Sequence, residues 1–131
     1  MFDISNKTIW VAGHNGMVGS AIVRRLEKEN CKILKVAKRE LDLINQKSTE
    51  EWLFYNKPEI IILAAAKVGG IYSNKKFKAN YIYENLMIQT NIIHGAYKAN
   101  IKNLIFLGSS CIYPKLCKQP IKENYFLSGK L

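Results

Sequence analysis

The fold of this chain is decided by the stretch Thr8-Ile9-Trp10-Val11-Ala12-Gly13-His14-Asn15-Gly16-Met17-Val18-Gly19. Its first five residues are mostly apolar, which predicts a buried strand. After Gly16, apolar residues follow at the spacing of a helix, namely Val18, Ile22, Val23 and Leu26. A strand, a turn with three glycines and a helix form the arrangement that holds the pyrophosphate of a dinucleotide.

The three glycines have different roles in such a turn. Gly13 makes the tight turn, Gly16 lets the backbone approach a phosphate, and Gly19 lets the helix pack closely on the strand. The phosphate then accepts hydrogen bonds from free N–H groups at the start of the helix. We therefore predict that a dinucleotide is bound by this loop, whose other members are Asn15, Met17 and Val18. A glycine-rich turn without a ligand is the alternative.

The rest of the chain alternates strand and helix patterns. Apolar runs predict strands over 32–36, 60–65 and 103–107, and helical spacing predicts a long helix over 81–99. Ser48 and Glu51 form a capping-box pattern that predicts the start of a shorter helix before Pro58. With right-handed crossovers, we predict an α/β fold with a Rossmann-type parallel sheet in the order 3-2-1-4 and helices on both faces. A ligand should then lie at the carboxyl ends of the strands, between the first and the fourth.

Composition narrows the class of protein. The net charge is +10, but the cations are mostly lysines spread along the 131 residues, so solvated helix faces explain them better than nucleic-acid binding. No apolar run is long enough to span a bilayer, and no secretory signal opens the chain. Cys31, Cys111 and Cys117 are widely spaced and lack a C-x-x-C pair, which argues against a zinc site or a disulfide framework. We expect a cytoplasmic protein without metal, membrane or nucleic-acid partners.

The residues after the second strand bear on the choice of cofactor. The segment Val36-Ala37-Lys38-Arg39 has no acidic residue at the strand tip, where an NAD-binding protein carries one for the ribose hydroxyls. Lys38 and Arg39 would instead attract the 2′-phosphate of NADP, so we predict NADP(H). Glu40 lies nearby and argues in the opposite direction. Asp42, just before Leu43, is either an adenine contact or a surface carboxylate.

The fourth strand leads into Gly108-Ser109-Ser110-Cys111-Ile112-Tyr113-Pro114, which resembles the extended short-chain dehydrogenase/reductases. Within them the chain is similar to the GDP-L-fucose synthase family, and further matching stretches are 12–19, 64–71 and 91–94. One departure is Asn15, where related loops often carry Arg. The resemblance implies cofactor contacts from Leu43, Ala64, Ala65, Ala66 and Leu107. It also places Lys67 near the nicotinamide half, and a solvated loop cation is the alternative for this residue.

In that family, a GDP-linked 4-keto-6-deoxy-mannose is epimerised at C3 and C5 and its keto group is then reduced by NADPH. Epimerisation requires a hydrogen-bond donor at the 4-oxygen, which stabilises the enolate, and a base that reaches both carbons. The resemblance implies that Ser109 is the donor and that Cys111 is the base or acid. The alternatives are a loop-capping hydroxyl for Ser109 and a small buried apolar residue for Cys111.

The family's catalytic Tyr-x-x-x-Lys follows the strand that ends at the serine. The single match here, Tyr72 to Lys76, lies elsewhere and is interpreted as chance. The resemblance therefore implies that residues 1–131 are the N-terminal part of an NADP-binding Rossmann domain, with the catalytic pair, further strands and the substrate domain beyond Leu131. We expect the chain to be inactive alone, its fourth strand to form an apolar edge, and the complete protein to be a homodimer.

Two other functions are compatible with the sequence. One is a different nucleotide-sugar epimerase/reductase of the same family, although Cys111 argues against a simple 4-epimerase, which needs no base at C3 or C5. The other is a non-catalytic NADP-binding module.

Overall fold

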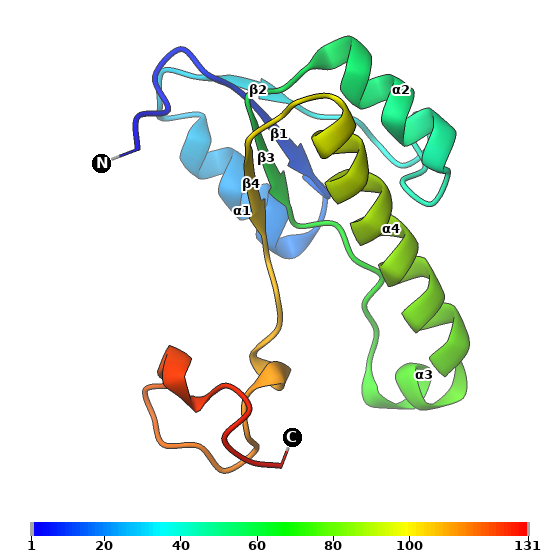
Figure 1. Cartoon of the computed structure of the whole chain (residues 1–131), viewed down its shortest axis with the longest axis vertical. Helices are drawn as coiled ribbons and strands as arrows, with labels where there is room; N and C mark the ends of the chain where they lie inside the picture. Colours follow the sequence, from blue (N-terminus) through cyan, green and yellow to red (C-terminus); the bar gives the residue numbers. More distant parts are fainter. Residues whose placement is uncertain (1, 131) are drawn as a thin grey trace.

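The computed structural model describes residues 2–130. Strands and helices alternate along the chain, as predicted (Figure 1). In order they are β1 (Thr8–Ala12), α1 (Met17–Leu26), β2 (Lys32–Leu34), α2 (Gln46–Asn56), β3 (Ile60–Leu63), α3 (Ile71–Lys76), α4 (Lys78–Lys98) and β4 (Asn103–Phe106), followed by two short 3-10 helices, η1 (Ser110–Ile112) and η2 (Glu123–Tyr125).

The four strands form a parallel sheet, but their order is β2-β1-β3-β4 and not the predicted 3-2-1-4. The prediction placed the third strand beside the second. In the structure β3 pairs with β1 instead, with Ile9 opposite Ile60 and Ala12 opposite Leu63. The chain therefore places β2 on one side of β1 and then returns to place β3 and β4 on the other side, so that the strand order reverses between β1 and β3.

The reason for this difference lies in the lengths and polarity of the strands. β2 has only three residues, none of them buried; it begins with Lys32 and is followed by Lys35, which suits a sheet edge. β3 is a continuous apolar run with three buried residues, which suits a position between two neighbours. The segment after β2 does not add a strand, because it turns back on itself with the N–H groups of Glu40 and Leu41 both bonded to the carbonyl of Ala37.

Helices cover both faces of the sheet, as predicted. Because side chains alternate along a strand, Ile9 and Val11 of β1 pack with α1 on one face, whereas Trp10 and Ala12 pack with α2 and α4 on the other. The reversal of strand order explains the division, since right-handed crossovers in opposite directions place their helices on opposite faces. Figure 1 shows α1 on one side of the sheet and α2 and α4 on the other.

The start of α2 differs from the predicted capping box. The capping residue is Asn45, whose side-chain oxygen accepts a hydrogen bond from the N–H of Ser48 at 3.0 Å, so Ser48 lies inside the helix. The observed pair, Asn45 and Ser48, has the same spacing of three positions as the predicted pair, Ser48 and Glu51. Asn is as favourable as Ser at the capping position, so the sequence pattern alone does not separate the two. The helix ends at Asn56, two residues before Pro58, as the sequence indicates.

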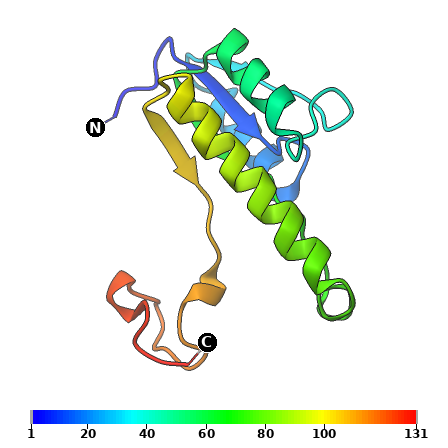
Figure 2. The ribbon, with the colours of Figure 1, turned by 45° about the vertical axis from the view of Figure 1, so that its right-hand side comes forward.

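The sheet ends at β4, in which three of the four residues are exposed. Ile105 is 53% exposed and Phe106 is 43% exposed, and within residues 2–130 no strand pairs with the outer side of β4. The expectation of an apolar sheet edge is therefore confirmed for the described residues. Figures 1 and 2 both show the chain after β4 leading away from the sheet.

The contact between α2 and α4 includes a carboxylate held by three polar side chains. Glu50 accepts hydrogen bonds from Lys98 at 2.6 Å and from Gln46 at 2.9 Å, and His94 Nδ1 lies 3.7 Å from it. The hydrogen bond from Lys98, followed by that from Gln46, lowers the pKa of Glu50 below its ordinary value of 4.5.

This lowered pKa predicts a pH dependence of stability. A carboxyl group with a depressed folded-state pKa stabilises the fold above about pH 4.5, and this stability is lost as the pH falls through the folded-state value. We expect Glu50→Gln to lose less stability than the unchanged protein between pH 7 and about pH 3, as measured by thermal unfolding. Glu51→Gln is the control, because Glu51 makes only an exposed 3.9 Å ion pair with Lys47. Equal acid sensitivity of all three proteins would contradict the assignment.

Three further features of residues 2–130 bear on the sequence expectations. None of their helices is both long and apolar enough to cross a membrane. No group of three His, Cys, Asp or Glu side chains among them is placed to hold a metal ion. Cys31, Cys111 and Cys117 are free thiols.

Candidate functional site

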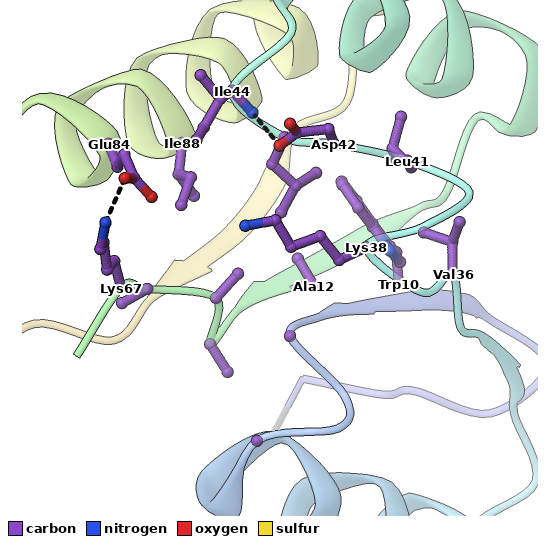
Figure 3. Close-up of a pocket in the computed structure, with 16 residues that line it drawn as sticks. Trp10, Ala12, Val36, Lys38, Leu41, Asp42, Ile44, Lys67, Glu84 and Ile88 are labelled. Carbon is purple, nitrogen blue, oxygen red and sulfur yellow. Dashed lines mark hydrogen bonds and ion pairs between the residues drawn. The ribbon is translucent and has the colours of Figure 1, made fainter. Parts of the chain in front are cut away.

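A pocket of about 490 Å³ lies at the carboxyl ends of β1, β2 and β3, where the strand order reverses (Figure 3). The volume is within the range of roughly 300–1,000 Å³ that cofactor sites occupy. In open parallel sheets, ligands bind at such reversal points. The predicted end of the sheet is therefore correct, but the pocket lies between β1 and β3 instead of between the first and fourth strands. Its lining is Trp10, Ala12, Gly13, Gly16, Val36, Lys38, Leu41, Asp42, Leu43, Ile44, Ala64, Ala65, Ala66, Lys67, Glu84 and Ile88.

The glycine loop forms one wall of the pocket, and its first and third glycines have no room for a side chain. Gly13 has φ +86°, and a Cβ atom there would lie 2.6 Å from both Cα and N of Ala65. A Cβ atom on Gly19 would collide with the carbonyl oxygen of Gly13. The first glycine thus lets β1 and β3 approach each other at their ends, and the third lets α1 begin directly against the turn.

The N-terminus of α1 is open toward this loop. Gly16 is the N-cap residue, no side chain in the described chain caps the helix, and its first turn contains no acidic residue. Its first N–H groups therefore have no partner within the helix and carry the positive end of the helix dipole. This arrangement suits an anionic phosphate.

The loop after β2 forms the opposite wall and contains an unpaired cation. Figure 3 shows the Lys38 side chain reaching into the pocket near Asp42. Among residues 2–130, Lys38 forms no ion pair. The carboxylate of Glu40 instead accepts a hydrogen bond from the N–H of Ala37 at 3.1 Å, which ties it into the turn. Asp42 Oδ1 accepts the N–H of Ile44 at 3.2 Å.

The loop after β3 contributes a second lysine in a different electrostatic state. The Lys67 ammonium group pairs with Glu84 of α4 and lies 5.3 Å from the ring centre of Tyr81. Both charged side chains are partly buried, with 33% and 22% exposure. The positive charge of Lys67 is therefore largely neutralised, and Lys38 is the cation that remains available to an anionic ligand.

The structure brings eight of the fourteen predicted cofactor contacts into the pocket lining. They are Gly13, Gly16, Lys38, Asp42, Leu43, Ala64, Ala65 and Ala66, and Lys67, which was expected near the nicotinamide half, also lines the pocket. Asn15, Met17, Val18 and Gly19 belong to the adjoining loop and first turn of α1 without lining the pocket, and Arg39 is exposed outside it. Leu107 follows β4 and does not line the pocket either.

The two predicted catalytic residues are not brought to the pocket. Ser109 and Cys111 lie in the segment after β4 and are both exposed. Ser109 Oγ accepts a hydrogen bond from the N–H of Cys111 at 3.1 Å, which is the capping contact considered as an alternative from the sequence. The alternative reading of Cys111 as a buried apolar residue is wrong, because its side chain is exposed. Tyr72 lies on α3, also outside the pocket.

Sequence reasoning missed a group of pocket residues that come from β1, from the loop after β2 and from α4. These are Trp10, Ala12, Val36, Leu41, Ile44, Glu84 and Ile88. Most are apolar residues whose core pattern resembles that of any strand or helix, so no local signal distinguishes them. Trp10 is fully buried against Trp52, and within the described residues its indole N–H is the one buried side-chain polar group without a hydrogen-bond partner.

Comparisons with known proteins place this geometry in a family. Residues 9–131 match the model of the NAD dependent epimerase/dehydratase family, and the chain belongs to that family. GDP-L-fucose synthase of Sinorhizobium fredii is 48% identical over 131 residues, which are 100% of this chain and 42% of the relative. GDP-L-fucose synthase 1 of Arabidopsis thaliana is 51% identical over 132 residues, with 100% of this chain and 41% of the relative covered.

A solved structure shows the same fold. It is a GDP-D-glycero-L-gluco-heptose synthase from Campylobacter jejuni in the presence of NADPH, with a TM-score of 0.88 and 39% sequence identity. The match covers 100% of this chain and 39% of that one. The chain thus spans less than half the length of the relatives that it matches.

Proposed function

We propose that this chain is the NADP-binding part of an enzyme that makes GDP-L-fucose from GDP-4-keto-6-deoxy-D-mannose. The observation that carries the cofactor assignment is the unpaired Lys38 in a pocket built on the glycine loop. The carboxylate of Glu40, which would repel a 2′-phosphate, is engaged by the N–H of Ala37. Similarity to GDP-L-fucose synthases over the whole chain supports the substrate assignment.

Each wall of the pocket has a role in this proposal. The N–H groups at the start of α1 bind the pyrophosphate, Lys38 binds the 2′-phosphate, and Leu43 and Ile44 line the space for the adenine ring. The end near Lys67 receives the nicotinamide half. When bound, NADPH supplies the hydride for reduction of the keto group.

Ser109 and Cys111 are proposed to act on the sugar. The Cys111 thiolate removes the proton from the carbon next to the ketone, and the electron pair of that C–H bond moves to the carbonyl oxygen, forming an enolate. The Ser109 hydroxyl donates a hydrogen bond to this oxygen. An acid on the opposite face of the sugar ring then gives its proton to the same carbon, which inverts the centre, and the Cys111 thiol releases its proton to solvent. Exposure of both side chains on the segment after β4 leaves them free to meet a substrate.

A substitution at Cys111 tests this assignment in the protein that carries the chain. With GDP-4-keto-6-deoxy-D-mannose in D₂O, we expect Cys111→Ala to slow deuterium incorporation at C3 and C5 by about 10²–10⁴-fold, because general base catalysis contributes that much. Mass spectrometry measures the incorporation. Cys117→Ala is the matched control, since Cys117 is a second free thiol in the same segment. An unchanged rate of deuterium incorporation in the Cys111 variant would contradict the proposed role of Cys111 as the base.

A second function is favoured by one comparison. Similarity to the GDP-heptose synthase from Campylobacter jejuni supports a reductase that acts on another GDP-linked sugar and uses the same cofactor pocket. Turnover of a GDP-keto-heptose in preference to the 6-deoxy-mannose derivative, compared by kcat/KM, would favour this alternative.

The assembly and location are also proposals. Exposed apolar side chains on α4, among them Ile82, Tyr83 and Leu86, support a homodimer that forms along this helix, which sedimentation velocity measures. The three free thiols support a reducing cytoplasm, which fractionation of the source cells tests.

A further inference from the structure

Helix α4 runs beside the pocket and carries two asparagines, Asn85 and Asn91, whose side chains bond to the two loops that line it. We propose that these asparagines are positioning residues, each of which fixes one end of the pocket independently of the other. The proposal rests on the dinucleotide function given above, and names the residues that hold the binding walls in place.

Asn91 fixes the loop after β2. Its side-chain amide donates hydrogen bonds to the carbonyl oxygens of Leu43 at 2.9 Å and of Ile44 at 3.0 Å. Asn91 is only 5% exposed, and Leu43 and Ile44 both line the pocket. The hydroxyl of Thr49 offers Leu43 a weaker contact of 3.5 Å. Asn91 is therefore the main donor for two carbonyl groups that would otherwise lose their partners.

Asn85 fixes the loop after β3. Its side-chain oxygen accepts the N–H of Lys67 at 2.8 Å, and its amide donates to the carbonyl oxygens of Lys67 and Tyr81, both at 2.9 Å. One side chain thus satisfies both backbone groups of Lys67 and links them to α4. The ion pair between Lys67 and Glu84 adds a second link to the same helix.

The two asparagines act at different places because six residues of helix separate them, or about 9 Å. Asn91 lies beside the loop that follows Lys38, at the end proposed for the adenosine half. Asn85 lies beside Lys67, at the end proposed for the nicotinamide half. If an asparagine is removed, its loop samples other conformations, and the apparent affinity falls with the fraction of molecules that stay competent to bind. Each substitution should therefore weaken the binding of only one half of the dinucleotide.

Binding of the two halves of NADPH separately tests this inference in the protein that carries the chain. The probes are adenosine 2′,5′-bisphosphate and reduced nicotinamide mononucleotide, measured by calorimetry or by competition with NADPH. We expect Asn91→Leu to weaken binding of the bisphosphate by about tenfold, as two lost hydrogen bonds imply, while the mononucleotide changes less than about twofold. Asn85→Leu should give the opposite pattern. Asn103→Leu is the matched control, because Asn103 also donates to a backbone carbonyl, that of Glu59, but at the amino end of β4.

The outcomes separate this inference from the proposed function. If the unchanged protein binds neither probe nor NADPH, the dinucleotide function fails and the inference fails with it. If it binds NADPH and each variant weakens both probes equally, the inference alone is overturned. If a variant does not fold, the inference is tested instead on the unchanged protein, by following the NMR signals of its asparagine side-chain amides during titration with each probe. The bisphosphate should shift the signal of Asn91 and spare that of Asn85, and a shift of both would overturn the inference.

Discussion

Gly13→Ala should weaken dinucleotide binding and remove much of the stability of this domain. The new Cβ atom would lie 2.6 Å from Cα and N of Ala65, which are backbone atoms that cannot move without separating β1 from β3. The residue would also have to keep φ near +86°, a conformation that disfavours any side chain. We expect the free energy of unfolding to fall by about 2–4 kcal/mol. NADPH affinity should fall more than about tenfold, because the pyrophosphate wall moves with the loop.

Chemical denaturation and NADPH titration measure the two effects. Gly70→Ala is the control, since Gly70 is also a loop glycine that precedes a helix, but its φ is −70° and a Cβ atom there would enter open space. Its stability should change by less than about 0.5 kcal/mol. If the Gly13→Ala and Gly70→Ala variants are equally stable, Gly13 does not lie as close to the backbone of Ala65 as the structure indicates.

Lys38→Glu should reverse the preference between NADPH and NADH. Lys38 is the pocket cation without an ion pair among the described residues, and a carboxylate in its place would repel a 2′-phosphate. A hydrogen bond to a charged group contributes about 1.5–3 kcal/mol, so loss of this bond together with the repulsion should weaken NADPH about 100-fold. NADH has no 2′-phosphate, and its affinity should change less than about threefold.

Fluorescence titration with both cofactors gives the ratio directly. Lys32→Glu is the matched control, because Lys32 is exposed at the amino end of β2, whereas Lys38 lies in the loop that follows its carboxyl end. Arg39→Glu should have a smaller effect than Lys38→Glu, since Arg39 lies outside the pocket lining. Equal weakening of NADPH and NADH by Lys38→Glu would mean that the lysine does not recognise the 2′-phosphate.

Local sequence signals predicted the elements of this fold but not their pairing. The glycine spacing, the apolar run of β3 and the helical spacing over 81–99 each depend on neighbours along the chain, and each predicted an element that is present. The core face predicted for the long helix was partly wrong, because Ala96 is buried but Leu86 and Ile93 are exposed. The strand order depends on which edges meet, and Ile60 carries no local sign that its partner is Ile9 instead of a residue of β2. Lys32 and Lys35, within and directly after β2, were the available clue to an edge strand.

The same distinction applies to the candidate site. Gly13 and Lys38 could be predicted because the backbone turn and the phosphate charge each require a particular residue type. Glu84, Asn85 and Asn91 could not, because they lie on a helix far along the chain and reach the pocket only after α4 has packed on the sheet. Ser109 and Cys111 were predicted by resemblance, and their position outside the pocket depends on contacts of the segment after β4 that no short motif contains.

The segment between β2 and α2 has a consequence for how cofactor preference can change over evolution. Since this segment forms a turn and adds no strand, its side chains at Lys38, Arg39 and Glu40 take no part in sheet pairing. Its attachment depends on the buried Leu41 and on backbone carbonyls that Asn91 holds, and the Glu40 carboxylate accepts the N–H of Ala37 within the turn. None of these contacts requires a given residue at positions 38 and 39. Substitutions at these two positions can therefore accumulate without loss of the folded domain. Cofactor choice in this chain is therefore a trait that selection can alter separately from the architecture that supports it.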